Sequence, residues 1–241
     1  MRITTRLAAI GVAAFLAGPA LAAGPQIVKG PGADTQCFKP WNEQTKFFQW
    51  PAKKGPYRIA LSNGYVGNTW RIQMIKTAKA FVELPDVKPD VKDFKVVSVG
   101  VDAAAQLGSI EDFINQGYDA IIINAVSPTG FDRVIRLANQ KGVVLVPFDN
   151  ALDTDQVMQV NEDNHQMGVL AGQWLLKYVG NKGDILEVRG VPGNSVDRDR
   201  HDGFQDTMKK GGTFNFTEVV GNWATGDSQK VTADALAVQG H

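Results

Sequence analysis

The chain has 241 residues, with 25 basic and 25 acidic side chains and a formal net charge of +0 at pH 7. It contains no basic patch, which argues against nucleic-acid binding because such binding depends on neutralising phosphates. Cys37 is the only cysteine, so the chain can form no internal disulfide and must be stabilised by burying a hydrophobic core.

The first 22 residues have the three parts of a secretory signal peptide. Arg2 and Arg6 give a positively charged start, residues 7–16 are apolar, and a small-x-small cleavage motif ends at Ala22. A membrane anchor is the alternative, but a spanning helix needs about 20 apolar residues and Pro19 interrupts this run. We therefore expect export with cleavage near Ala22, either to a bacterial periplasm or through a eukaryotic secretory route.

The segment that follows, residues 23–56, has prolines and glycines at short intervals and no sustained hydrophobic period. We therefore expect an irregular N-terminal extension. Phe47, Phe48 and Trp50 are its apolar residues and are expected to pack it onto the rest of the chain.

From Tyr57 onward, short apolar runs alternate with amphipathic stretches of helical spacing. The alternation predicts a parallel sheet wound by right-handed crossovers, with helices covering both faces. Four strands are predicted at residues 57–62, 94–99, 119–123 and 143–148. Three helices are predicted at residues 69–84, 103–116 and 128–140, the last of them capped by Ser127.

The alternation restarts after residue 150, with strands predicted at 157–160, 184–188 and 214–220. A helix capped by Asn164 is followed by helices at 196–210 and 228–239. We therefore predict an α/β protein with two Rossmann-like lobes, residues 57–150 and 151–241, of which the second is truncated. The helix after Asn164 carries an apolar stripe that is typical of a core-facing helix. The stripe consists of Met167, Leu170, Ala171, Trp174, Leu175 and Tyr178.

Sequence motifs for catalysis or metal binding are missing. The three histidines fit no HExxH or Cys/His spacing. Residues 193–197 depart from the GxSxG motif, and residues 62–67 break the GxGxxG spacing. We therefore expect no enzymatic activity, no metal and no cofactor. An α/β enzyme that uses Asp149 or His201 is the rival hypothesis.

Polar and aromatic residues follow the predicted strands, where open α/β sheets bind their ligands. Carboxylates, guanidinium groups and amides hydrogen-bond to hydroxyls, and an indole can stack on the C–H face of a sugar. Asn and Asp are also common turn residues, but this mixture recurs at five strand ends and favours a sugar. The residues are Asn63, Asn68, Trp70 and Arg71; Asn124; Asp149 and Asn150; Arg189 and residues 194–200; and Asn222 and Trp223.

Arg200 lies on the apolar face of its predicted helix, together with Val196, Phe204 and Met208. A charged side chain on an inward face is costly unless it is paired. An ion pair with an acid in the core would satisfy it, and so would a ligand. We favour the ligand contact.

From Tyr57 to its end the chain resembles the sugar-binding branch of the type I periplasmic binding proteins, which includes the ribose-binding proteins of ABC importers. The stretch 115–128 is also similar to binding proteins for the autoinducer-2 signal. The resemblance rests on the order and spacing of several motifs. They are residues 59–62 leading to 68–70, residues 117–124, 146–150 and 163–164, and residues 190–195 leading to 198–200 and 203–204.

The resemblance implies two lobes that close on a small ligand, with hinge crossings near Asp149. It also implies a monomeric periplasmic protein that delivers a sugar to an ABC permease in the inner membrane. A periplasmic sensor that presents a sugar or autoinducer-2-like ligand to a membrane receptor is the alternative. Arg71 stands where the family often has an aromatic residue, and Asn150 where it often has arginine. The other implied ligand contacts are Asn68, Trp70, Asn124, Asp149, Arg200 and Trp223.

Overall fold

The structure, a computed structural model, describes residues 24–30, 40 and 42–238. The predicted signal peptide lies outside the described residues. Within them, every helix is too short or too polar to cross a bilayer.

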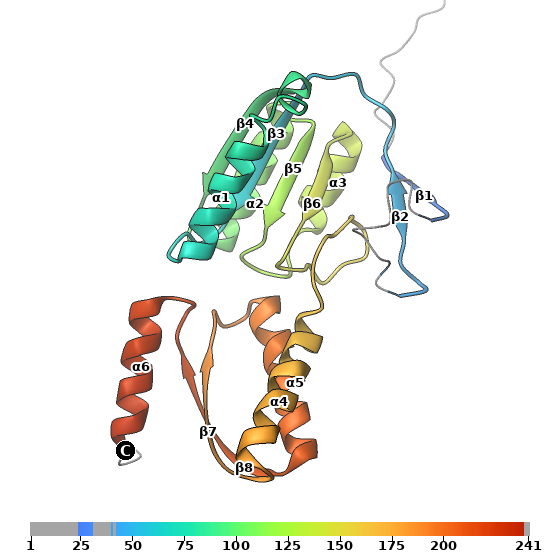
Figure 1. The fold of residues 1–241 in the computed structure, drawn as a ribbon. Coiled ribbons are helices and arrows are strands. Elements are labelled where there is room, and N and C mark those ends of the chain that lie inside the picture. The colour runs from blue at the N-terminus through green and yellow to red at the C-terminus, as the bar shows by residue number, and fades with distance from the viewer. Residues whose placement is uncertain (1–23, 31–39, 41, 239–241) are drawn as a thin grey trace, which may run out of the picture.

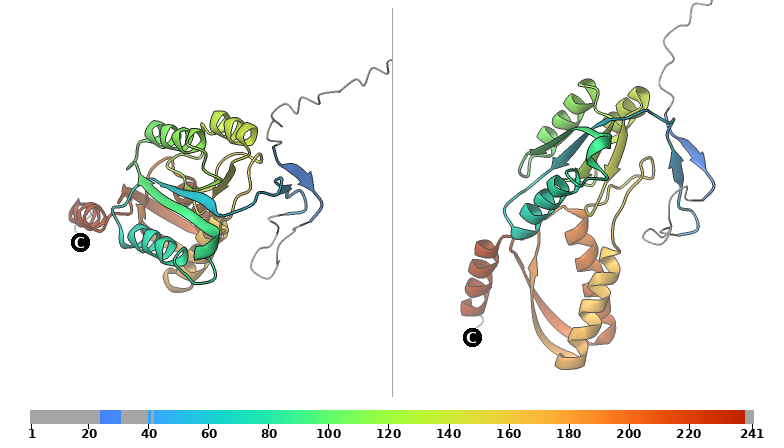
Figure 2. Two further views of the ribbon diagram at one scale, coloured as in Figure 1. Left: turned by 90° about the horizontal axis from the view of Figure 1, so that it is seen from above. Right: turned by 45° about the horizontal axis from the view of Figure 1, so that its top comes forward.

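The first lobe is built on a four-stranded parallel sheet with the strand order β4-β3-β5-β6. One face is covered by α1 (Thr69–Phe81), and the other by α2 (Ala103–Asn115) and α3 (Asp132–Lys141) (Figures 1 and 2). The hydrophobic core lies mainly between the sheet and the last two helices, where Ile110, Ile121 and Ile135 are buried. The strands are β3 (Tyr57–Asn63), β4 (Val91–Ser98), β5 (Ala120–Asn124) and β6 (Val144–Pro147).

Local sequence explains most of these boundaries. Asp102 caps α2 by accepting a hydrogen bond from the Ala105 amide at 2.9 Å, and Gly142 ends α3 in the left-handed conformation. The prediction for the start of α3 was wrong. The helix begins at Asp132, because the Ser127 hydroxyl accepts a hydrogen bond from the amide of Thr129 and closes a turn there instead.

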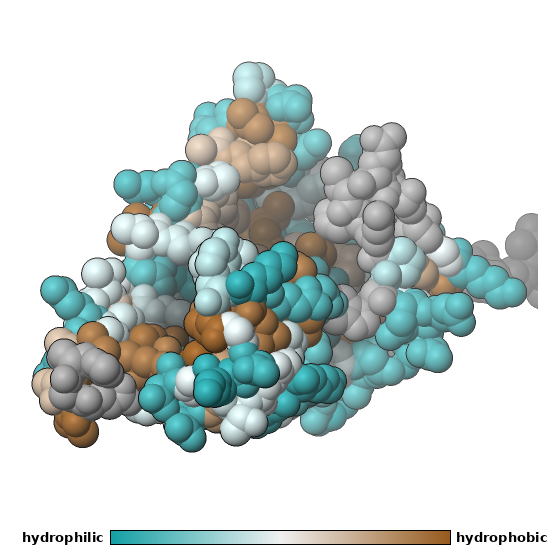
Figure 3. All heavy atoms as spheres, turned by 60° about the horizontal axis from the view of Figure 1, so that its bottom comes forward, coloured by the Kyte–Doolittle hydropathy of each residue, from teal (hydrophilic) through white to brown (hydrophobic). Residues whose placement is uncertain are grey.

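The second lobe holds a parallel pair of strands, β7 (Lys182–Arg189) and β8 (Thr213–Val220). The helices α4 (Asn164–Val179) and α5 (Ser195–Gly211) pack together on one side of the pair, and α6 (Thr225–Val238) lies on the other (Figure 1). The strand predicted at residues 157–160 is reduced to a bridge between Phe148 and Val160. Hydrophobic residues are exposed to solvent on the surface near the C-terminal end of the described chain (Figure 3). Among them, Val238 is 88% exposed.

The packing of α4 differs from the prediction. Its cap is Asp163 rather than Asn164, and the apolar stripe faces outward, with Trp174 58% exposed. The buried face instead carries Gly168 and Gly172. A Cβ at Gly168 would lie 2.0 Å from the Arg200 carbonyl oxygen. Two helix backbones approach this closely only where side chains are absent, so the glycines decide which face of α4 meets α5.

The N-terminal extension is less irregular than predicted. It contains a short antiparallel pair, β1 (Gln26–Val28) and β2 (Phe47–Gln49). The ring of Phe48 packs against Trp50 at 5.9 Å between centroids. Ion pairs from Lys46 to Asp155 and from Lys53 to Asp119 attach the extension to the body of the protein.

Candidate functional site

Arg71 is a buried cation at the carboxyl end of β3. It lies in the first turn of α1, is only 6% exposed, and its Nη1 atom donates to Asn63 Oδ1 at 3.0 Å. Its guanidinium lies 5.3 Å from the ring centroid of Trp70. Burial lowers the pKa of Arg71 from its ordinary value, and the carboxylate of Asp149 partly opposes that change. A buried arginine near an acid fits a site that binds hydroxyl groups, since both kinds of charged partner strengthen hydrogen bonds.

Asn124 and Asp149 meet where β5 and β6 end. Asn124 Nδ2 donates to Asp149 Oδ2 at 3.0 Å, while Asn124 Oδ1 is buried and has no partner among the described residues. Asp149 has a φ of 61°, in the left-handed region, and its amide donates to the Val160 carbonyl at 3.1 Å. Backbone strain of this kind costs of order 1–3 kcal/mol and is concentrated at functional sites.

Asn150 has a different position from its neighbour. It is 2% exposed, and its Nδ2 donates to the Ala125 carbonyl at 2.6 Å. This bond ties the segment after β6 to the segment after β5. In this arrangement Asn150 supports the backbone that carries Asp149.

Asn68 and Trp223 connect the two lobes. The Oδ1 atom of Asn68 accepts from the Arg71 amide at 2.9 Å and caps α1, while its Nδ2 donates to the Trp223 carbonyl at 3.3 Å. Trp223 has a φ of 51° and its indole lies against Gly190, where any Cβ would be 2.2 Å from the ring. Trp70 leaves half of its surface exposed, so its indole is available to a ligand.

Arg200 pairs with groups at the start of α4. Its Nε donates to Asn164 Oδ1 at 2.8 Å, and its Nη2 lies 3.5 Å from Glu162 Oε1. The expected alternative of an ion pair is therefore present. The acid lies at the surface rather than in the core, because the side chains of Arg200 and Glu162 are 40% and 43% exposed.

Glu162 was missed by the sequence analysis. It stands two residues after the predicted strand at 157–160, so the rule that ligand groups follow strand ends could have found it. Burial raises the pKa of Glu162 above its ordinary value, and hydrogen bonding and repulsion from Asp149 add to the rise while Arg200 opposes it. Through Glu162, the second-lobe arginine is connected to the first-lobe cluster of Arg71, Asn124 and Asp149.

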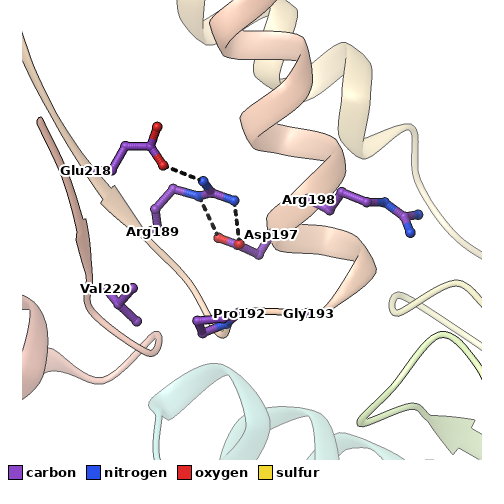
Figure 4. A pocket seen from close by; sticks show the side chains of 7 residues that line it. All are labelled: Arg189, Pro192, Gly193, Asp197, Arg198, Glu218 and Val220. Atoms are coloured by element: carbon purple, nitrogen blue, oxygen red, sulfur yellow. Dashed lines mark hydrogen bonds and ion pairs between the residues drawn. The ribbon is translucent and has the colours of Figure 1, made fainter. Parts of the chain in front are cut away.

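A separate cavity of about 460 Å³ lies at the carboxyl ends of β7 and β8 (Figure 4). It contains none of the eight ligand contacts that the resemblance implies, although Arg189, Asp197 and Arg198 are among the strand-end residues predicted from the sequence. Arg189 crosses it and donates to Asp197 at 2.8 Å and to Glu218 at 2.9 Å, so its charges are already paired within the protein. We therefore do not place the ligand there. The lining residues are Arg189, Pro192, Gly193, Asp197, Arg198, Glu218 and Val220.

Beside this cavity, Glu187, His201 and Glu218 bring potential metal-ligand atoms within 4.8 Å of one another. His201 Nδ1 lies 2.9 Å from Glu187 Oε1, and Arg189 lies 2.9 Å from Glu218 and 3.9 Å from Glu187. The guanidinium of Arg189 thus already forms ion pairs with both carboxylates. This arrangement opposes metal binding at the cluster.

Comparison with known proteins places the chain among binding proteins. Residues 59–241 match the family described as periplasmic binding protein domain. The ribose import binding protein of Bacillus subtilis (strain 168) is 31% identical over 154 residues, which are 64% of this chain and 49% of that protein. The galactofuranose-binding protein of Escherichia coli (strain K12) is 28% identical over 163 residues, 66% of this chain and 50% of that protein. The chain thus spans about half the length of these relatives.

Solved structures show the same fold. The crystal structure of a galactofuranose binding protein has a TM-score of 0.70 at 25% identity, with 76% of this chain and 62% of that chain covered. An ABC transporter solute binding protein from Thermobispora bispora has a TM-score of 0.70 at 28% identity, with 75% and 57% covered. The predicted α/β class with parallel sheets is confirmed. The chain belongs to the periplasmic binding protein domain family.

Proposed function

We propose that the chain is the substrate-binding component of an ABC importer and binds a small sugar or polyol between its two lobes. The observation that carries the proposal is the cluster of Arg71, Asn124 and Asp149. Asn124 and Asp149 stand at the carboxyl ends of β5 and β6, and Arg71 reaches the end of β3 from the first turn of α1, at the edge where parallel sheets bind ligands. The names of relatives point to the same ligand class, namely ribose, galactofuranose and xylitol.

Each side chain has a distinct task in this proposal. Asp149 accepts hydrogen bonds from ligand hydroxyls, Arg71 donates to ligand oxygens, and Asn124 can satisfy its unpartnered Oδ1 with a ligand hydroxyl. The exposed indole of Trp70 covers the C–H face of the sugar. Arg200 donates from the second lobe, so that a ligand holds the two lobes together.

The charges also favour a neutral ligand. Arg71 and Arg200 supply two positive charges, and Asp149 and Glu162 supply two negative ones. A ligand with a net charge would leave one of these groups without compensation, which is costly in a partly desolvated site. We further propose that the protein acts as a periplasmic monomer and delivers its ligand to a permease in the inner membrane.

Isothermal titration calorimetry against a panel of D-ribose, D-galactose, L-arabinose and xylitol tests the proposal. We expect saturable binding of at least one member, with a change in tryptophan fluorescence. Asp149→Asn and Arg200→Ala should each weaken that binding at least tenfold, about 1.4 kcal/mol. Asparagine is chosen because it tolerates the left-handed backbone at this position.

The control is Glu83→Gln, which changes an exposed carboxylate paired with Lys88. It should bind as the unsubstituted chain does. Absence of binding across the panel would reject a sugar-binding function. Unchanged affinity in both site variants would reject the site while leaving the function intact.

A further inference from the structure

Glu162 is held beside the candidate site by the backbone. Val160 forms a parallel bridge with Phe148, and its carbonyl accepts from the Asp149 amide at 3.1 Å. The segment that follows Val160 therefore starts next to Asp149. The Asn164 amide donates to the Glu162 carbonyl at 3.0 Å, which fixes the turn that leads into α4.

The side chain of Glu162 joins charges from both lobes. Its Oε1 lies 3.5 Å from Arg200 Nη2, and the nearby charge of Asp149 helps to raise its pKa. On the other side, the charge of Asp149 acts on the buried guanidinium of Arg71. The charges of Arg200, Glu162, Asp149 and Arg71 thus act on one another in that order, with the two acids in the middle of the series.

Adjacent carboxylates repel one another unless donors lie between them or around them. Asn124 supplies one donor to Asp149, and Arg200 faces Glu162. With 43% of its side chain exposed, Glu162 still has lone pairs that an incoming molecule can reach. Carboxylates only accept hydrogen bonds, so the pair is suited to a molecule that presents two donors close together.

We propose that Glu162 contacts the ligand and sets its specificity, by accepting a hydrogen bond from one of two neighbouring hydroxyl groups while Asp149 accepts from the other. This inference rests on the proposed function and names its ligand class as neutral sugars or polyols with a vicinal diol. Each hydroxyl proton then lies between ligand and carboxylate and reduces the repulsion within the pair. Arg200, whose Nη2 lies 3.5 Å from Glu162 Oε1, neutralises the charge of Glu162.

A ligand that lacks one hydroxyl of the diol would leave one carboxylate without its donor. Hydrogen bonds to charged groups are the ones that are most costly to leave unmade. The preference for a diol should therefore depend on the charge and acceptor capacity of Glu162. Glu162→Gln keeps the size of the side chain but replaces one acceptor oxygen by a donor, so it should weaken this preference selectively.

The test is a double-mutant cycle by calorimetry on the full chain. The panel member that binds most tightly is compared with its 2-deoxy and 3-deoxy analogues, in the unsubstituted protein and in Glu162→Gln. We expect at least one deoxygenation to weaken binding to the unsubstituted protein about tenfold, or about 1.4 kcal/mol, and to weaken binding to Glu162→Gln less than about threefold. Glu83→Gln should retain the full tenfold effect.

The outcomes separate this inference from the proposed function. If no panel member binds the unsubstituted protein, both are wrong. If a sugar binds and deoxygenation has the same effect in both proteins, Glu162 does not read the diol and only this inference is wrong. Thermal unfolding of Glu162→Gln checks that the variant is folded. Should it not be, Glu162→Ala, which removes the carboxylate altogether, replaces it and must show the same loss of coupling.

Discussion

Replacing Gly168 by alanine should destabilise the protein, although alanine is the better helix former. The glycine lies on the face of α4 that meets α5, and a Cβ there would lie 2.0 Å from the Arg200 carbonyl oxygen and 2.8 Å from the Phe204 amide nitrogen. Cβ atoms in proteins essentially never approach another atom closer than 3.0 Å. Both obstacles are backbone atoms, so no side-chain rotation can relieve the clash and the two helices must separate by about 1 Å.

The magnitude follows from two opposing effects. Replacing glycine by alanine within a helix raises the free energy of unfolding by roughly 0.5–1 kcal/mol, because alanine has the higher helix propensity. A gap of about 1 Å forfeits up to about half of the dispersion energy across the interface, and overpacking typically costs about 1–3 kcal/mol. The backbone clash puts Gly168 at the upper end of that range, so we expect a net loss of about 2 kcal/mol. In a chain of this size that lowers Tm by roughly 4–8 °C.

Gly108, in α2, provides the matched control because a Cβ there meets nothing within 4 Å. Gly108→Ala should raise the free energy of unfolding by about 0.5–1 kcal/mol. Urea unfolding followed by circular dichroism measures both variants. If Gly168→Ala were as stable as Gly108→Ala, the close approach of α4 and α5 would be refuted. Because the displaced backbone carries Arg200, Gly168→Ala should also weaken sugar binding.

Two further predictions concern ionisable groups. Asp197 is 7% exposed and accepts from Arg189 and from the buried Gly190 amide. Asp197→Ala should therefore lower the free energy of unfolding, measured in urea, by about 2–4 kcal/mol. Asp234→Ala, which breaks an exposed ion pair with Lys230, should lower it by at most about 0.5 kcal/mol. Equal losses in the two variants would contradict the buried network around Asp197. The pKa of Glu162 is raised in the folded state above its ordinary value of 4.5. The folded protein therefore binds more protons than the unfolded chain between these two pKa values. The free energy of unfolding should fall as the pH rises from about 4.5 through the raised pKa. Tm measured against pH should show this decline in the unsubstituted protein and a shallower one in Glu162→Gln, and parallel curves would be the contrary result.

The sequence predicted the order of strands and helices well where hydrophobic period alone decides it. The strand predicted at residues 57–62 is observed as β3 with one further residue, because Ile59, Ala60 and Leu61 form the short apolar run that is typical of a buried parallel strand. The hydrophobic periodicity of the sequence predicted the wrong buried face for α4. Its apolar stripe faces outward, since the absence of side chains at Gly168 and Gly172 outweighs the hydrophobicity of Trp174 and its neighbours in choosing the contact with α5.

The candidate site was predictable to the extent that it depends on strand ends. Arg71, Asn124 and Asp149 come together because the carboxyl ends of parallel strands meet at one edge of the sheet. Their role as ligand contacts stays a prediction. The strand-end rule could have named Glu162 as a candidate, but its place beside Asp149 depends on the single bridge between Phe148 and Val160. A one-residue pairing leaves no periodic signal in the sequence.

The amide of Asn68 gives the protein a built-in spectroscopic reporter. Its Oδ1 is fixed to the start of α1, while its Nδ2 reaches the Trp223 carbonyl of the other lobe. Any rotation that separates the lobes lengthens the 3.3 Å bond to Trp223 without disturbing the cap. The side-chain NH₂ resonances of Asn68 in a ¹⁵N-labelled sample should therefore shift with the arrangement of the lobes, and Asn68→Asp, which keeps the cap but cannot donate, assigns them.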